Sequence, residues 1–154
     1  MHLFTIGFSG KSSQRFFTTL QAAGVCKVID VRRSNNTLYC GFTRARDLPF
    51  LLERICDIQY VAEPEFSPSL ELLRDYQARL KHDKKNPAAW PEYTTRFLQE
   101  LSSRPIVDLF ERHTADCETP CLLCTEPTPE HCHRRLVAEY IKEHAKKDIR
   151  IEHL

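Results

Sequence analysis

Residues 121–145 read CLLCTEPTPEHCHRRLVAEYIKEHA, and this stretch indicates the class of the fold. Its first part, CLLCTE, is a short apolar run typical of a buried strand. A loop with prolines follows, and the segment that begins at Pro129 and Glu130 has the pattern of a helix. Strands that alternate with helices build parallel sheets, because parallel neighbours need crossover connections. The stretch therefore predicts an α/β fold.

The same alternation continues toward both ends of the chain. Other short apolar runs predict strands at residues 2–6, 26–31, 58–61 and 149–154. Helical spacing predicts helices around residues 16–20, ending at Gly24, and at 44–56, 67–82 and 91–101. Ser67-Pro68 is a favoured helix start, whereas residues 106–113 are too few to assign. We expect one α/β domain over residues 1–154, Rossmann-like and three-layered, with a mainly parallel open sheet of about five strands and helices on both faces.

Ligands of such sheets bind beyond the carboxyl ends of the strands. In this chain those ends carry polar loops at residues 7–10, 30–33 and 124–134. We therefore expect these three loops to converge at one edge of the sheet and to form the functional pocket.

The overall composition limits the possible partners. Lys and Arg total 22 against 21 Asp and Glu, so any affinity for nucleic acid must come from a local patch. The chain has no basic leader before a long apolar run, and no apolar stretch approaches the ~20 residues of a membrane helix. We expect a cytoplasmic protein with no membrane partner. Seven cysteines are an odd set without a signal peptide, so we expect reduced thiols rather than a disulfide framework.

The strongest local pattern is CTEPTPEHCHRR at residues 124–135. Cys132, His133 and Arg134 fall near the start of the predicted helix, where unpaired N–H groups favour a thiolate or another anion. Arg134 offers a planar donor set for phosphate or carboxylate, and His133 titrates near neutral pH. The simpler alternative is that the cysteines are small buried residues and that Glu126 caps the helix.

A second pattern is IDVRR, in which Asp30 and Arg32 point to the same side of a strand. Arg32 and Arg33 can bind an anionic substrate, or Arg32 can form a structural ion pair. An aromatic segment around Trp90 and Tyr93 can stack bases, although core packing is the ordinary explanation.

A metal site is the main rival for the cysteine-rich region. Six candidate ligands fall within a short span, namely Cys117, Cys121, Cys124, His131, Cys132 and His133. Their spacing fits poorly, because Cys121 and Cys124 lie three apart on a predicted strand and face opposite sides. We therefore expect no metal and no other cofactor.

Together, the motifs FTIGFSG, IDVRR, GFTRARDLPFLL and LLCTEPTPEHCHRRLVAEY resemble the family known as domain of unknown function 488. The resemblance extends from Phe4 to Leu154 and implies an α/β domain, but no established reaction. By position it marks Thr5, Gly7, Ser9, Asp30, Arg32, Cys124, Glu126, Cys132, His133 and Arg134. Many members have a histidine after the first glycine, where this chain has Phe8.

From these patterns we expect an enzyme that acts on a phosphate-bearing substrate, a nucleotide or a nucleic acid. The candidate catalytic residues are Cys124, Glu126, Cys132 and His133. The candidate substrate-binding residues are Thr5, Gly7, Ser9, Asp30, Arg32, Arg33 and Arg134. Two alternatives stay open: a non-catalytic module that binds a nucleotide or nucleic acid, and sulfur transfer through a persulfide on Cys124.

Overall fold

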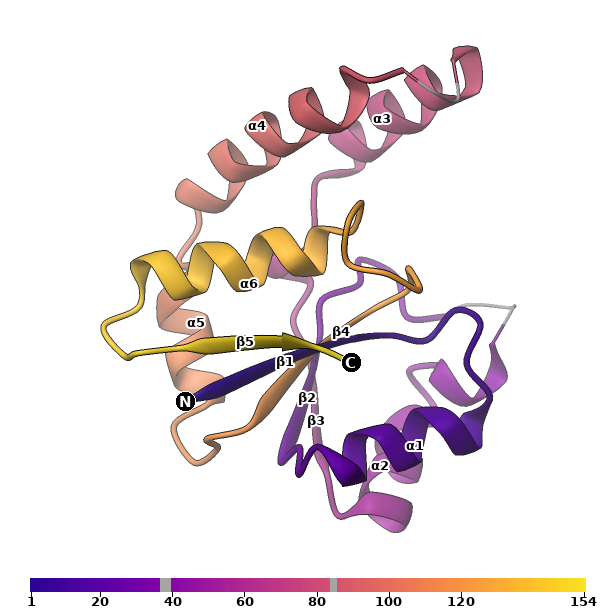
Figure 1. The fold of residues 1–154 in the computed structure, drawn as a ribbon, viewed down its shortest axis with the longest axis vertical. Helices are drawn as coiled ribbons and strands as arrows, with labels where there is room; N and C mark the ends of the chain where they lie inside the picture. The colour runs from indigo at the N-terminus through magenta and orange to yellow at the C-terminus, as the bar shows by residue number, and fades with distance from the viewer. Residues whose placement is uncertain (37–39, 84–85) are drawn as a thin grey trace.

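The computed structural model of the chain describes residues 1–36, 40–83 and 86–154. In these residues five strands form one sheet, in which every pair of neighbours is parallel (Figure 1). The strand order is β3-β2-β4-β1-β5. The strands are β1 (His2–Gly7), β2 (Lys27–Asp30), β3 (Gln59–Ala62), β4 (Pro120–Cys124) and β5 (Arg150–His153). The predicted α/β fold with an open parallel sheet is confirmed.

Helices cover both faces of the sheet (Figure 1). One face carries α1 (Ser13–Ala22) and α2 (Leu48–Cys56), and the other carries α4 (Ala89–Ser102), α5 (Ile106–His113) and α6 (His133–His144). The helix α3 (Leu70–His82) pairs with α4, and short 3-10 turns lie at Gly41–Thr43 and Pro64–Phe66. No helix in the described part of the chain is long and apolar enough to span a bilayer.

The central strand β4 contributes to the hydrophobic core on both faces of the sheet. Leu122 and Cys124 pack in the cluster with α4, α5 and α6, whereas Cys121 and Leu123 pack in the cluster with α1 and α2. This division follows from the alternation of side chains along a strand. All five residues of β4 are buried, as expected of a strand covered by helices on both faces.

Three of the predicted helices begin later than their sequence patterns indicate, and one of them is α2, which begins at Leu48 rather than at Arg44. Helix α3 begins at Leu70, because the side chain of Ser69, rather than the Ser67-Pro68 pair, caps it by accepting from the N–H of Leu72 at 3.1 Å. Helix α6 begins at His133 rather than at Pro129, because Cys132 still has extended backbone angles.

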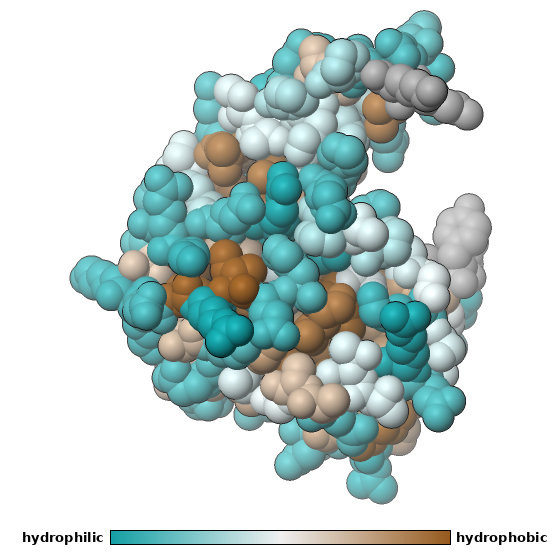
Figure 2. Space-filling view, viewed as in Figure 1, coloured by the Kyte–Doolittle hydropathy of each residue, from teal (hydrophilic) through white to brown (hydrophobic). Residues whose placement is uncertain are grey.

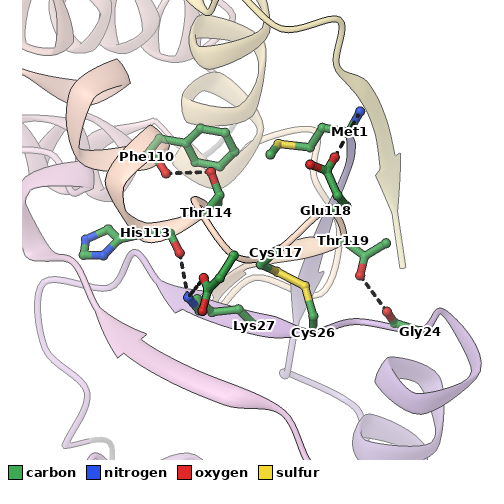
Figure 3. The surroundings of a disulfide bond; sticks show 11 residues. Met1, Gly24, Cys26, Lys27, Phe110, His113, Thr114, Cys117, Glu118 and Thr119 are labelled. Carbon is green, nitrogen blue, oxygen red and sulfur yellow. Dashed lines mark hydrogen bonds and ion pairs between the residues drawn. A yellow bond between two sulfur atoms is a disulfide. The ribbon is translucent and has the colours of Figure 1, made fainter.

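The predicted set of reduced thiols is wrong for one pair. Cys26 and Cys117 form a disulfide with a Cα–Cα distance of 6.0 Å (Figure 3), whereas the other five cysteines are free. The two residues are 91 apart in sequence, but each comes shortly before one of the paired strands β2 and β4. Sequence spacing cannot reveal this proximity, because it arises only when the two strands pair.

Candidate functional site

The carboxyl ends of three neighbouring strands meet at one edge of the sheet. In the register of the sheet Gly7 of β1 pairs with Cys124 of β4, and Asp30 of β2 pairs with Leu123. The loops after these strands are therefore adjacent, as predicted from the sequence. The N-terminus of α6 arrives at the same edge, because the loop after Cys124 leads directly into it.

A groove of about 470 Å³ opens beside this edge. Its inner side is formed by Arg32, Cys124, Cys132 and His133. The facing wall comes from α3 and α4, with the side chains Leu70, Leu73, Tyr76, Gln77, Leu80, Trp90 and Tyr93. Figure 2 shows the surface hollowed between this pair of helices and the rest of the protein. The groove thus joins an apolar and aromatic wall to a side that carries thiols and basic groups.

Cys124, Cys132 and His133 form a compact cluster in the groove. The two sulfur atoms and a ring nitrogen of His133 lie within 4.8 Å of one another. His133 Nε2 lies 2.9 Å from the carbonyl oxygen of Val31. Because a carbonyl only accepts, Nε2 donates in this contact, and in the neutral tautomer that keeps this proton Nδ1 is the acceptor. Nδ1 lies 3.7 Å from Cys124 Sγ, so a proton acceptor stands beside the thiols.

The surroundings of Cys124 favour its thiolate. A hydrogen bond from the Cys132 thiol lowers the pKa of Cys124 against the opposing effect of burial. The backbone N–H groups of Thr125 and Glu126 and the charge of Arg134 lower this pKa further, to below its ordinary value. The same hydrogen bond, together with burial, raises the pKa of Cys132. Of the two thiols, Cys124 therefore has the lower pKa and accepts the hydrogen bond, whereas Cys132 donates it.

Arg32 is held in a buried ion pair but keeps one free donor. Its Nε and Nη2 donate to the carboxylate of Asp30 at 2.8 and 2.6 Å, and Nη2 also donates to the carbonyl of Thr43. The structural ion pair considered for this residue is thus present. Nη1 is buried and has no hydrogen-bond partner among the described residues, although Arg32 lines the groove. An oxyanion in the groove is the kind of ligand that would satisfy this N–H group.

Arg134 braces the loop from inside the protein. It is 0 % exposed, and its Nη1 donates to the carbonyl oxygen of Glu126 at 2.6 Å. Its Nε lies 3.4 Å from Thr5 Oγ1, which is also fully buried. Thr5 and Arg134 do not line the groove. Arg134 therefore lies behind the groove, and its contact with an anionic substrate stays a prediction; its charge lowers the pKa of Cys124.

Gly7 is required by a close approach of the loop. A Cβ atom at this position would lie 1.6 Å from the carbonyl oxygen of Glu126 and 3.0 Å from Arg134 Nη1. Any other residue would therefore push the loop away from the end of β1. Gly7 positions the loop rather than touching a substrate.

Of the remaining predicted residues, two line the groove and two lie behind it. Arg33 and Glu126 are exposed and line the groove. Asp30 is fully buried and accepts from Arg32 and from the Tyr60 hydroxyl, at 2.8 Å in the latter case. Ser9 donates its backbone N–H to the carbonyl of Thr125 at 3.0 Å. Asp30 and Ser9 thus hold the groove together without lining it.

The thiol cluster also offers three donors to a soft cation. Within the described chain, the group of possible metal ligands consists of Cys124, Cys132 and His133. A structural zinc site is usually closed by four protein ligands, so this set does not form one.

The sequence did not indicate the wall of the groove. Trp90 and Tyr93 pack closely, with ring centroids 5.1 Å apart, as the core interpretation predicts, yet both also line the groove. Tyr76 and Leu73 of α3 join them. Their role depends on α3 packing against α4 above the loop, a tertiary contact without a local sequence signal.

Comparison with known families agrees with this arrangement of motifs. The model of the family described as domain of unknown function DUF488 matches residues 12–141. No curated protein and no solved structure matches the chain. The matched range includes Asp30, Arg32 and the whole segment from Cys124 to Arg134. Since the match spans most of the chain, this protein belongs to the DUF488 family.

Proposed function

We propose that this protein is a sulfurtransferase in which Cys124 carries a sulfur atom as a persulfide. The observation that supports this most is the position of Cys124 in the groove, with Cys132 and the N–H groups of Thr125 and Glu126 favouring its thiolate. Thiolates, not thiols, attack sulfur. The buried Nη1 of Arg32, which has no hydrogen-bond partner among the described residues, supports a donor with an anionic group.

The transfer needs two displacement steps at sulfur. With thiosulfate as donor, the Cys124 thiolate attacks the outer sulfur, a sulfur–sulfur bond forms, and sulfite leaves with the electron pair of the broken bond. In the second step an acceptor thiolate attacks the outer sulfur of the persulfide. Cys124 then leaves as the thiolate, which restores the groove without any other reactant.

Phosphoryl transfer from the expected nucleotide or nucleic-acid substrate has less support. A phosphoryl group in transfer spreads its charge over three equatorial oxygens and needs several donors. Of the two arginines assigned to that task, Arg134 is buried and engaged with Glu126 and Thr5. Arg32 contributes only one nitrogen, Nη1, that has no hydrogen-bond partner among the described residues. A persulfide on Cys124 carries a single negative charge, and the Cys132 thiol and the N–H groups of Thr125 and Glu126 already supply hydrogen-bond donors for it.

A second candidate function is binding of a nucleotide without turnover. It is supported by the rings of Tyr76, Trp90 and Tyr93 on the wall of the groove, facing a basic side with Arg32 and Arg33. Bases stack on aromatic side chains, and arginine binds phosphate. Saturable binding of a nucleotide that Trp90→Ala weakens, without sulfur uptake at Cys124, would favour this function over sulfur transfer.

The proposed reaction is tested by mixing the purified protein with thiosulfate and excess cyanide together, so that cyanide takes the outer sulfur as soon as the persulfide forms, and by measuring the thiocyanate produced. We expect wild-type protein to transfer sulfur to cyanide catalytically, and Cys124→Ser to lose more than about a thousandfold in rate, as removal of a nucleophile does. Cys56→Ser is the matched control, because burial raises the pKa of Cys56, which lies on the other face of the sheet.

Two results would reject sulfur transfer. One is the absence of thiocyanate formation by folded wild-type protein, and the other is equal activity of Cys124→Ser and wild type. Loss of activity in Cys56→Ser to the same extent would also count against the assignment to Cys124.

A further inference from the structure

We propose that Cys132 resolves the persulfide on Cys124, so that the protein releases its sulfur as hydrosulfide and becomes a Cys124–Cys132 disulfide. This inference rests on the proposed function, since it begins from the persulfide. It adds a second catalytic residue and an end product, and it makes an external dithiol the second substrate.

The two thiols lie in position for such a step. Their sulfur atoms belong to the cluster whose ligand atoms lie within 4.8 Å of one another, and both residues line the groove. Cys132 is 1 % exposed, so its thiol faces the cluster rather than solvent. It has extended backbone angles at the N-cap of α6 and makes no capping hydrogen bond with its side chain. No capping bond therefore competes for the Cys132 thiol, which faces Cys124.

The step balances without a further oxidant. His133 first takes the proton of the Cys132 thiol, and the resulting thiolate attacks Cys124 Sγ. The bond between Cys124 Sγ and the outer sulfur breaks, the outer sulfur leaves with the electron pair, and the proton passes from His133 to it, so hydrosulfide is released. Two cysteine sulfurs are oxidised to a disulfide, and the transferred sulfur is reduced to hydrosulfide. An external dithiol then reduces the disulfide and becomes a disulfide itself.

The other cysteines do not compete for this role. Cys121 is fully buried and packs on the opposite face of the sheet, with α1 and α2. Cys40 and Cys56 pack against that same cluster. Cys26 and Cys117 are already joined to each other. Among the described residues, Cys132 is the free thiol that shares the groove with Cys124.

The experiment loads wild type and Cys132→Ser with thiosulfate in the absence of any thiol, then removes the excess. For wild type we expect about one sulfide released per chain, as the one-to-one displacement requires, and a mass two hydrogen atoms below that of the reduced protein. For Cys132→Ser we expect a mass higher by one sulfur atom, sulfur that cyanide still removes, and sulfide release more than about a hundredfold slower, because attack by a tethered thiol is lost. Cys56→Ser should behave as wild type.

The outcomes separate this inference from the proposed function. If wild type keeps its persulfide as long as Cys132→Ser does, Cys132 is not the resolving residue, although sulfur transfer stands. If neither protein takes up sulfur, both proposals fail. Cys132→Ala, with proteolytic mapping of the disulfide in wild type, repeats the comparison if the serine variant does not fold; a bond from Cys124 to any cysteine other than Cys132 would overturn the inference.

Discussion

The protein holds two pairs of cysteines, which lie at opposite ends of the same sheet. Cys26 and Cys117 come before β2 and β4 and are joined by a disulfide, whereas Cys124 and Cys132 follow β4 and are free thiols. Around the first pair, backbone groups bond to each other across the strands, as in the hydrogen bond from the N–H of Cys26 to the carbonyl of Thr119 at 3.2 Å. Around the second pair lie N–H donors, a histidine and a groove.

The difference shows that position in the sheet determines the chemistry of a cysteine. At the carboxyl end, the loop after β4 and the charge of Arg134 favour the thiolate of Cys124. At the amino end, Cys26 and Cys117 are bonded to each other, so neither has a free thiolate that could act as a nucleophile. We therefore expect the two pairs to respond separately to substitution, one in stability and the other in reactivity.

The largest expected effect is on stability at the amino end. The double substitution Cys26→Ala/Cys117→Ala should lower the free energy of unfolding by about 2–4 kcal/mol, because a disulfide restricts the unfolded chain. Urea unfolding measures the change, and sulfur uptake by Cys124 at low denaturant should be unaffected. A parallel loss of sulfur uptake in folded protein would show that the two ends are coupled.

Gly7→Ala should lower both the stability of the protein and the reactivity of Cys124 at the carboxyl end of the sheet. The added Cβ meets the carbonyl of Glu126, so we expect a loss of about 1–3 kcal/mol in unfolding free energy, as for overpacking. Alkylation of Cys124 by iodoacetamide should also slow, because the displaced loop takes its N–H groups with it. Gly41→Ala is the control, since nothing lies within 4 Å of its Cβ; equal effects at the two glycines would contradict the role of the loop.

Cys132→Ala should change the pH dependence of Cys124. The Cys132 thiol lowers the pKa of Cys124, so its removal should raise that pKa. At any given pH, a smaller fraction of Cys124 is then thiolate in the variant than in wild type. The pH profile of iodoacetamide alkylation should therefore shift to higher pH, with a severalfold slower reaction at neutral pH. Mass spectrometry of the Cys124 peptide measures the rate, and an unshifted profile would remove Cys132 from this role.

Arg33→Ala should have the smallest effect. Arg33 is exposed at the rim of the groove, where a single charge is worth a fraction of a kcal/mol, so the KM for thiosulfate should rise about 2–3-fold with little change in kcat. The difference should vanish at high salt, because exposed charges are screened. Arg15→Ala, on α1, removes an exposed charge elsewhere and should leave KM unchanged.

Most of the fold could be predicted from local sequence patterns, because the alternation of apolar runs and helical spacing directly reflects strands and helices. The meeting of Asp30, Gly7 and Cys124 at one edge followed from the rule for parallel sheets. The direction of Arg134 could not be predicted, because an arginine near the start of a helix can point outward to a ligand or inward to a carbonyl. The α3–α4 wall and the Cys26–Cys117 bond depend on contacts between segments far apart in the chain.

The network around Asp30 has a consequence for the response of the groove to pH. Burial and the Asp30 carboxylate raise the pKa of Tyr60 to about 12. Burial lowers the pKa of Arg32, but the hydrogen bonds and charge of Asp30 outweigh it and raise that pKa above its ordinary value. Tyr60 and Arg32 therefore keep their protons throughout the range in which thiols and imidazoles titrate. They form an electrically constant background, against which the pH dependence of activity would report Cys124, whose pKa lies below its ordinary value.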